Sequence, residues 1–227
     1  MNRRLLLVRH GVTTWNREGR FQGHLDPPLD DAGVIEARLL AERLVREEPG
    51  PLRIVSSPLQ RALATATLLA DALSAAGRPP EASTDPRLME IGQGEWEGLT
   101  HVDLDRTDAD RYAAWRAGGG STEPPGGEPL EEAQLRVNAV LDELTQQASA
   151  SVCLVSHGGI LRLAARQLLG LDLARAWSMD VDNASLSRLM REDSAATWRL
   201  DGWNDTGHLL GHAPQHLDES EGAPLAL

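Results

Sequence analysis

The feature that most constrains this chain is a short apolar run, residues 5–8, which ends abruptly in Arg9, His10 and Gly11. An uninterrupted apolar run of this length is typical of a strand that is buried on both faces. The residues after such a strand emerge at the carboxyl edge of an open α/β sheet, where ligands bind. Gly11 lets the backbone turn sharply and approach a ligand. The pattern predicts a guanidinium and an imidazole side by side at a ligand site, although it also fits a strand that merely ends in a polar turn.

A second apolar run, residues 151–155, ends in a similar way, with Ser156, His157 and Gly158. It is the best candidate for a central strand of the chain. If the two strands are neighbours in one sheet, their histidines converge at one site.

Apolar runs alternate with amphipathic stretches along the chain. We expect strands at residues 5–8, 52–55, 81–84, 151–155, 185–190 and 196–200. We expect helices at residues 31–46, from Pro58 onward, and at residues 101–117, 130–148 (with Leu135 on its core face) and 160–169. Strands that alternate with helices predict an α/β fold with a single doubly wound, mostly parallel sheet and helices on both faces.

At 227 residues the chain is long enough for one well-buried domain, and two full domains are not expected. We predict one domain over residues 1–204. Within it, residues 99–128 are expected to form a cap or lid insertion, because residues 118–127 are rich in glycine and proline, as mobile linkers are. Residues 205–227 are polar and interrupted by glycine and proline, so we expect a loosely ordered carboxyl-terminal tail.

The charge balance limits the classes of partner. All 22 basic residues are arginine, and the formal net charge is −12. A chain this acidic has no basic surface for nucleic acid or an anionic membrane, so neither is expected as a partner. Without lysine, the chain holds neither a P-loop lysine nor a Schiff-base lysine. Arginine is left as the main fixed positive charge, and its forked guanidinium matches phosphate and carboxylate oxygens in pairs.

Cys153 is the only cysteine, so no disulfide can form within the chain, which suits a reducing compartment. Its apolar neighbours favour a buried, inert thiol over a nucleophile. The first apolar run is too short for the core of a signal peptide or for a membrane span. We therefore expect a soluble, cytoplasmic protein.

The two strand-end histidines are joined by other reactive groups. Arg9 precedes His10, and Arg61 lies about one turn into the helix after residue 58, where a helix amino terminus favours anions. Glu90 lies on a glycine-bounded loop. Two histidines, two arginines and a carboxylate are what phosphoryl transfer through a covalent histidine requires.

Each group has a predicted role in that reaction. His10 is the nucleophile, which must be neutral and oriented through its other ring nitrogen. Arg9, Arg61 and His157 hold the phosphoryl oxygens, whose charge needs preorganised donors. Glu90 protonates the departing oxygen and then takes a proton from water.

Every one of these residues also has a structural explanation. His157 could simply end a strand with its ring hydrogen-bonded, and Arg61 could pair with an acid on the first helix. Glu95 and Glu97 compete with Glu90 for the acid role on composition alone.

Taken together, four motifs of the chain resemble the histidine phosphatase superfamily, which has the phosphoglycerate mutase-like fold. The resemblance spans roughly residues 5–204, and its motifs occur in the family's order: residues 7–16 (LVRHGVTTWN), 56–62 (SSPLQRA), 88–90 (LME) with 94–98 (GEWEG), and 155–159 (VSHGG). The resemblance implies a phosphohistidine at His10 and a phosphate site of Arg9, Arg61 and His157. It also implies Glu90 as proton donor, contacts from Asn16 and the Gln22–Gly23 loop, and no metal or other cofactor.

Within that family, the chain resembles the broad-specificity phosphatase branch. Mutases of the family carry a longer insertion with paired arginines and a lysine, whereas residues 99–128 here are short and hold no such pair. We therefore expect a phosphomonoester hydrolase, with a cofactor-dependent phosphoglycerate mutase as the alternative because Arg106, Arg111 and Arg116 could meet a second anion. A non-catalytic phosphate-binding protein is a further alternative, disfavoured because all five expected residues are present.

The expected partner is a small phosphorylated metabolite, and a homodimer is an open alternative to a monomer. Tyr112, Trp115 and Trp96 could line a rim for a sugar or aryl phosphate, although aromatic residues in such patterns are more often core. Residues 198–204 are similar to the carboxyl-terminal pattern of family members that act on sugar-phosphoglycerate esters, which points to such an ester. His208, His212 and His216 have the spacing of a helical metal site, but Gly211 and Pro214 argue against that helix.

Overall fold

The computed structural model describes residues 2–118, 122–147, 151–192 and 197–211. In these ranges the strands are β1 (Asn2–Arg9), β2 (Leu52–Ser56), β3 (Glu81–Thr84), β4 (Ser151–Ser156), β5 (Leu186–Glu192) and β6 (Arg199–Asp205). The α-helices are α1 (Thr14–Arg17), α2 (Asp31–Glu47), α3 (Gln60–Ala75), α4 (His101–Thr107), α5 (Ala109–Ala117), α6 (Leu130–Gln147), α7 (Gly158–Leu169) and α8 (Leu173–Trp177). Three short 3₁₀ turns are η1 (Pro86–Leu88), η2 (Gly94–Trp96) and η3 (Gly207–Leu209).

The strands form one mixed sheet in the order β3-β2-β4-β1-β5-β6. The four strands from β3 to β1 pair in parallel, and β5 and β6 add antiparallel neighbours. The predicted doubly wound, mostly parallel α/β sheet is therefore confirmed. Parallel pairing places the carboxyl ends of β1, β2 and β4 at one edge, where the candidate residues follow.

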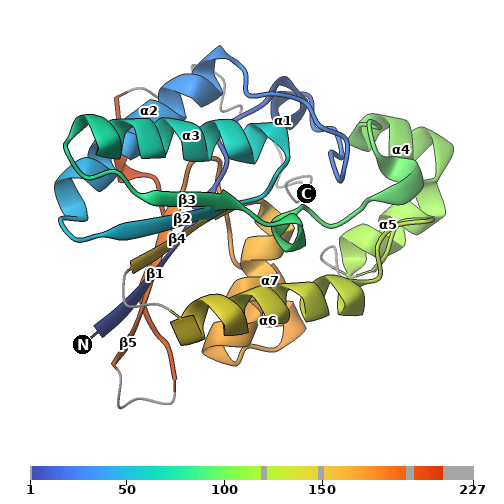
Figure 1. The fold of residues 1–227 in the computed structure, drawn as a ribbon. Coiled ribbons are helices and arrows are strands. Elements are labelled where there is room, and N and C mark those ends of the chain that lie inside the picture. The colour runs from blue at the N-terminus through green and yellow to red at the C-terminus, as the bar shows by residue number, and fades with distance from the viewer. Residues whose placement is uncertain (1, 119–121, 148–150, 193–196, 212–227) are drawn as a thin grey trace.

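Helices cover both faces of the sheet (Figure 1). Side chains of a strand alternate between the faces, so Leu6 and Val8 of β1 pack with α2 and α3. Leu5 and Leu7 pack on the other side with α6 and α7. Both faces are apolar, which explains why the first strand is an uninterrupted apolar run.

A separate aromatic cluster supports α4 and α5, which lie at one end of the sheet (Figure 1). Tyr112 and Trp115 stack on each other, and Phe21 and Trp96 meet them edge to face. All four side chains are buried. The hypothesis that Trp96, Tyr112 and Trp115 line an aromatic rim is wrong, because these buried rings pack α5 and η2 onto Phe21.

Several element boundaries differ from the expectation. Helix α3 begins at Gln60, so Pro58 lies before its first turn. Leu135 is exposed rather than in the core, because α6 turns its neighbours Val137, Val140 and Leu141 toward the sheet. Residues 119–121 of the predicted linker and residue 148 of the predicted helix lie outside the described residues.

The carboxyl-terminal strand is shifted along the chain. Strand β6 covers Arg199–Asp205 rather than residues 196–200, and η3 follows it. Asp205 forms an ion pair with Arg43 of α2 at 2.5 Å, so the first residues of the predicted tail pack on the fold. Residues 212–227 of that tail lie outside the described ranges.

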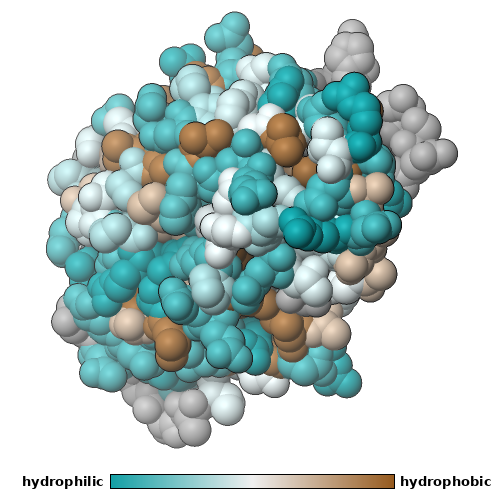
Figure 2. Space-filling model, turned by 90° about the vertical axis from the view of Figure 1, so that its right-hand side faces the viewer, coloured by the Kyte–Doolittle hydropathy of each residue, from teal (hydrophilic) through white to brown (hydrophobic). Residues whose placement is uncertain are grey.

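The face that carries α4 and α5 shows apolar side chains in small separate groups among hydrophilic ones (Figure 2). Such scattered groups are ordinary for a folded domain. Among the described helices, none is both long and apolar enough to cross a membrane.

Candidate active site

Strands β1 and β4 bring the two histidines together. The parallel register sets Arg9 opposite Ser156, so the next residues, His10 and His157, leave the sheet side by side. Their ring centroids are 5.1 Å apart and the rings are tilted by 59°. Both imidazoles are buried. The condition on which the sequence argument depended, that the two strands are neighbours, is met.

The ring of His10 has a defined orientation. Its Nδ1 lies 2.7 Å from the carbonyl oxygen of Gly11. A carbonyl only accepts hydrogen bonds, so Nδ1 carries the hydrogen and Nε2 carries the lone pair. Burial, together with the charges of Arg61 and Arg9, holds the pKa of His10 well below its ordinary value. His10 is therefore a neutral imidazole whose Nε2 carries the lone pair.

The ring of His157 is held from both sides. Nε of Arg61 donates to its Nδ1 at 3.2 Å, and its Nε2 lies 2.8 Å from Oγ of Ser57. Because the guanidinium can only donate, Nε2 is the protonated nitrogen and donates to the hydroxyl. Burial, followed by the charge of Arg61, keeps the pKa of His157 well below its ordinary value.

Arg9 and Arg61 supply buried positive charge beside the histidines. Nη1 of Arg9 donates to the carbonyl of Val181 at 2.6 Å, and its buried Nε has no partner among the described residues. Arg61 donates to the carbonyls of Leu25 and Gly23 at 2.9 Å. Burial lowers the pKa of each arginine to about 10, so both stay charged near neutral pH. An anion between them would relieve the cost of burying these charges.

Glu90 is the acid that reaches this group. One carboxylate oxygen accepts from the backbone N–H of Ile91 at 2.9 Å, and the other from that of Gly159 at 3.3 Å, at the start of α7. Glu95 is exposed, and Glu97 instead accepts from the backbone of His24 and Gln93. The geometry therefore favours Glu90 over its two competitors.

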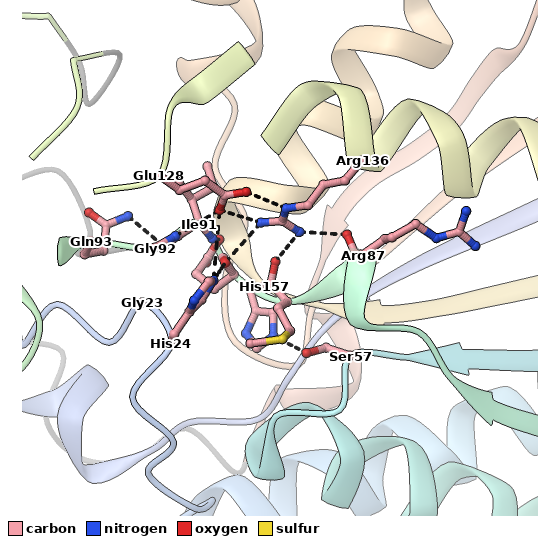
Figure 3. A network of polar contacts seen from close by, with 12 residues as sticks. Gly23, His24, Ser57, Arg87, Ile91, Gly92, Gln93, Glu128, Arg136 and His157 are labelled. Carbon is pink, nitrogen blue, oxygen red and sulfur yellow. Dashed lines mark hydrogen bonds and ion pairs between the residues drawn. The ribbon is translucent and has the colours of Figure 1, made fainter. Parts of the chain in front are cut away.

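A network that the sequence did not reveal fixes the backbone around Glu90 (Figure 3). Arg136 of α6 donates to the carbonyls of Arg87 and Met89 at 2.7 Å and of Glu90 at 3.1 Å. The same guanidinium pairs with both carboxylate oxygens of Glu128, at 2.6 and 2.8 Å. Nothing in the sequence marks an arginine on this helix face for such a role, because the three carbonyls that it holds come from a loop more than 40 residues earlier.

His24 joins the loop after β1 to the same network. Its Nε2 lies 2.8 Å from the carbonyl oxygen of Glu90 and 4.0 Å from Glu128 (Figure 3). His24 directly follows Gly23, which belongs to the Gln22–Gly23 loop expected to contact the substrate. A backbone φ of +47° and a contact with Glu97 that leaves no space for a Cβ explain the glycine.

The other expected contact residues lie around the loop after β1. Oδ1 of Asn16 caps α1 by accepting from Thr13 at 3.0 Å, and it lies 3.4 Å from Nδ2 of Asn183. That same Asn183 amide donates to the carbonyl of His10 at 3.1 Å. Gln22 is buried, and its Oε1 has no partner among the described residues. Asn16 and Gln22 thus flank the loop, and Asn183 is a further neighbour that the sequence did not single out.

The site holds no evident metal centre. Within the described ranges, no three histidine, cysteine or acidic side chains are arranged to hold a metal ion. His208 lies in η3 and its Nδ1 is 3.3 Å from Arg43, while His212 and His216 are outside those ranges. The arrangement offers instead a neutral imidazole, two guanidinium groups and a carboxyl group, which suit attack on an anionic ester.

The same architecture occurs in known proteins. A model of the histidine phosphatase superfamily (branch 1) matches residues 5–206. Phosphoserine phosphatase 1 of Hydrogenobacter thermophilus is 36% identical over 191 residues, which cover 84% of this chain and 87% of that protein. The probable phosphoglycerate mutase GpmB of Yersinia pestis is 36% identical over 207 residues, which cover 89% of this chain and 93% of that protein.

Solved structures agree with the family match. The mycobacterial glucosyl-3-phosphoglycerate phosphatase in complex with VO3 superposes with a TM-score of 0.77 and 35% sequence identity. The match covers 89% of this chain and 98% of that one. The chain belongs to the histidine phosphatase superfamily (branch 1).

Proposed function

We propose that this protein is a phosphomonoester hydrolase that works through a phosphohistidine at Nε2 of His10. The observation that supports this most directly is the state of that ring. Its Nδ1–H is fixed on the carbonyl of Gly11 at 2.7 Å, and its low pKa leaves Nε2 unprotonated beside two arginines. A neutral, oriented imidazole among fixed positive charges is what attack on a phosphate ester needs.

Arg9, Arg61 and His157 are the proposed phosphate holders. The Nε of Arg9, which no group in the described part of the chain engages, offers a preorganised donor to the phosphoryl oxygens. Asn16, Gln22 and Gly23 are proposed to contact the phosphate or the group esterified to it, since they flank the loop whose carbonyl at Gly23 holds Arg61.

Glu90 is the proposed acid and base. Nε2 of His10 attacks phosphorus, the bond from phosphorus to the ester oxygen breaks, and Glu90 gives its proton to the departing oxygen. The Glu90 carboxylate then takes a proton from water, and the water oxygen attacks phosphorus. The bond from phosphorus to Nε2 breaks, inorganic phosphate leaves, and both residues return to their starting forms.

The substrate is proposed to be a small phosphorylated metabolite of the sugar phosphate or phosphoglycerate ester class. The names of two relatives, a phosphoserine phosphatase and a glucosyl-3-phosphoglycerate phosphatase, support that class. Residues 99–128 are proposed to be the cap that selects among such esters.

Mutase activity is the second candidate, because one relative is named a probable phosphoglycerate mutase. The cap argues against it. Arg106 pairs with Asp103 at 3.2 Å, Arg111 lies 3.9 Å from Asp108, and Arg116 stacks on Tyr112. These three arginines are engaged on the surface of α4 and α5, so they are not free to hold the second phosphate that a mutase must bind.

The test is release of inorganic phosphate from a panel of phosphomonoesters, with 3-phosphoglycerate assayed with and without its bisphosphate primer. Wild type is expected to release phosphate and His10→Ala is expected to release none. Isomerisation of phosphoglycerate with little hydrolysis would favour the mutase. Binding without turnover would favour a phosphate-binding protein, and sedimentation equilibrium would decide between a monomer and a homodimer.

A further inference from the structure

We infer that Arg162 binds a second anionic group of the substrate, a carboxylate carried close to the phosphate ester. The inference rests on the proposed function for its choice of substrates and goes beyond it by adding a recognition residue. Nothing in the sequence motifs points to Arg162, because it lies within the amphipathic helix that follows His157.

The structure places the Arg162 guanidinium at the site. Arg162 lies one turn after Gly158 on α7, and helical side chains lean back toward the amino terminus. A Cβ added at Gly158 would lie 3.4 Å from Nη1 of Arg162 and 3.7 Å from Cζ of Arg9. The two guanidinium groups therefore flank the same point at the start of α7.

Arg162 is buried but is not neutralised. Its side chain is 7% exposed, and its Nε donates to the carbonyl of Met179 at 2.9 Å. Among the described residues, neither Nη group has a hydrogen-bond or ion-pair partner. Glu90, Asp180 and Asp182 attract it only from a distance, and burial still lowers its pKa. A buried guanidinium with unused donors is costly unless an anion completes it.

The site thus holds more positive charge than one phosphate group needs. Arg61 donates to His157 and Arg9 directly precedes His10, and both arginines are proposed to take the phosphoryl oxygens. Glu90 is already held by two backbone N–H groups, so it is not committed to Arg162. The forked guanidinium of Arg162 fits a carboxylate with two parallel hydrogen bonds.

Two pairs of esters isolate the carboxylate. Phosphoserine and phosphoethanolamine differ only by a carboxylate on the carbon that carries the amine. 3-Phosphoglycerate and glycerol 3-phosphate differ by a carboxylate in place of a hydroxymethyl group. Replacing a residue that recognises the carboxylate should weaken binding of the carboxylate-bearing ester more than binding of its partner in the pair. Replacing a residue that only supports the fold should weaken binding of both esters equally.

Binding is measured by calorimetry in the His10→Ala background, where no turnover is expected, for each of the four esters. We expect the carboxylate-bearing member of at least one pair to bind more tightly, and adding Arg162→Met to weaken that member about tenfold or more. The other member should change by less than about threefold. Arg162→Lys should restore part of the preference, because it keeps the charge without the fork.

Arg166→Met is the matched control, because Arg166 lies one turn further along α7 and donates to Gln134 at 2.9 Å, away from the site. It should leave the preference intact. Absence of any preference in the His10→Ala protein, or equal losses for both members of each pair in Arg162→Met, would overturn the inference. Phosphate release by wild type is scored separately, so a failure of the hydrolase proposal leaves this result readable.

Discussion

Nε of Arg61 donates to Nδ1 of His157 across 3.2 Å, inside the fold and at the end of a parallel strand. A permanent cation as hydrogen-bond donor prevents that nitrogen from accepting a proton. The ring of His10 lies 5.1 Å from that of His157, and the charge of Arg61 also lowers the pKa of His10. The two imidazoles are therefore kept neutral by their surroundings, and this has a measurable consequence for stability.

The first prediction concerns the pH dependence of unfolding. The folded-state pKa of both His10 and His157 is well below the ordinary value of 6.5, so the unfolded chain binds more protons as pH falls below that value. The contribution of each histidine to the free energy of unfolding is fully present above pH 6.5. Below pH 6.5, the free energy of unfolding should fall by about 1.4 kcal/mol per pH unit for each histidine. Urea unfolding at pH 7.5, 6.0 and 5.0 measures the decline. Replacing either histidine with Gln should flatten it by that amount, and parallel curves would contradict the prediction.

The second prediction tests Glu90 as the proton donor. Glu90→Gln removes the transferable proton but keeps a side chain of the same shape near Gly159. The loss in kcat should be at least about a hundredfold for an alkyl phosphate. It should be much smaller for nitrophenyl phosphate, whose leaving group scarcely needs a proton. Steady-state kinetics on both esters measure the ratio, and equal losses would remove Glu90 from the acid role.

The third prediction concerns Arg136, which we regard as a positioning residue. Arg136→Met removes the donor shared by three carbonyls of the Glu90 loop, so the carboxyl group should lose its orientation. We expect kcat on an alkyl phosphate to fall about tenfold or more, with a smaller fall on nitrophenyl phosphate. Arg43→Met is the control, because Arg43 forms comparable ion pairs on α2 away from the site. If both substrates slow equally, the role of Arg136 is in folding rather than in placing the acid.

The fourth prediction concerns the contact between the loop after β1 and the start of α2. A Cβ added at Gly33 would lie 2.0 Å from the carbonyl oxygen of Val12, so Gly33→Ala must shift the helix. The shift would also strain the 2.8 Å hydrogen bond from the N–H of Val12 to Glu36. We expect a loss of at least about 2 kcal/mol in the free energy of unfolding. Gly50→Ala, where a Cβ meets nothing within 4 Å, should change it by less than about 0.5 kcal/mol in the same urea titration.

Much of the fold was predictable from local patterns. Apolar runs such as residues 5–8 and 151–155 identify strands buried on both faces, because helices pack against both faces of each strand. Parallel pairing then places the residues after both runs at one edge. The neighbouring positions of His10 and His157 follow from that rule once the two strands are adjacent, and the family motifs agree with it.

Other features depend on partners that are distant in the sequence. The spacing of the aromatic residues in the sequence fits both a rim around the substrate site and a buried cluster. The packing of Phe21 against Trp96, Tyr112 and Trp115 shows that they form a buried cluster. Helical periodicity likewise placed Leu135 inward, yet the rotation of α6 leaves it in solvent.

The sequence by itself determined the sheet, the family and the group of residues gathered at its edge, because these depend on short-range periodicity and on ordered motifs. Only the tertiary structure decided that Glu90 lies against the start of α7, that Arg136 holds its loop, and that Arg162 lies beside Arg9 with donors unused by the described residues. The physical reason is that a side chain's hydrogen bonds and burial are set by elements brought together in space, and local sequence patterns carry no record of those partners.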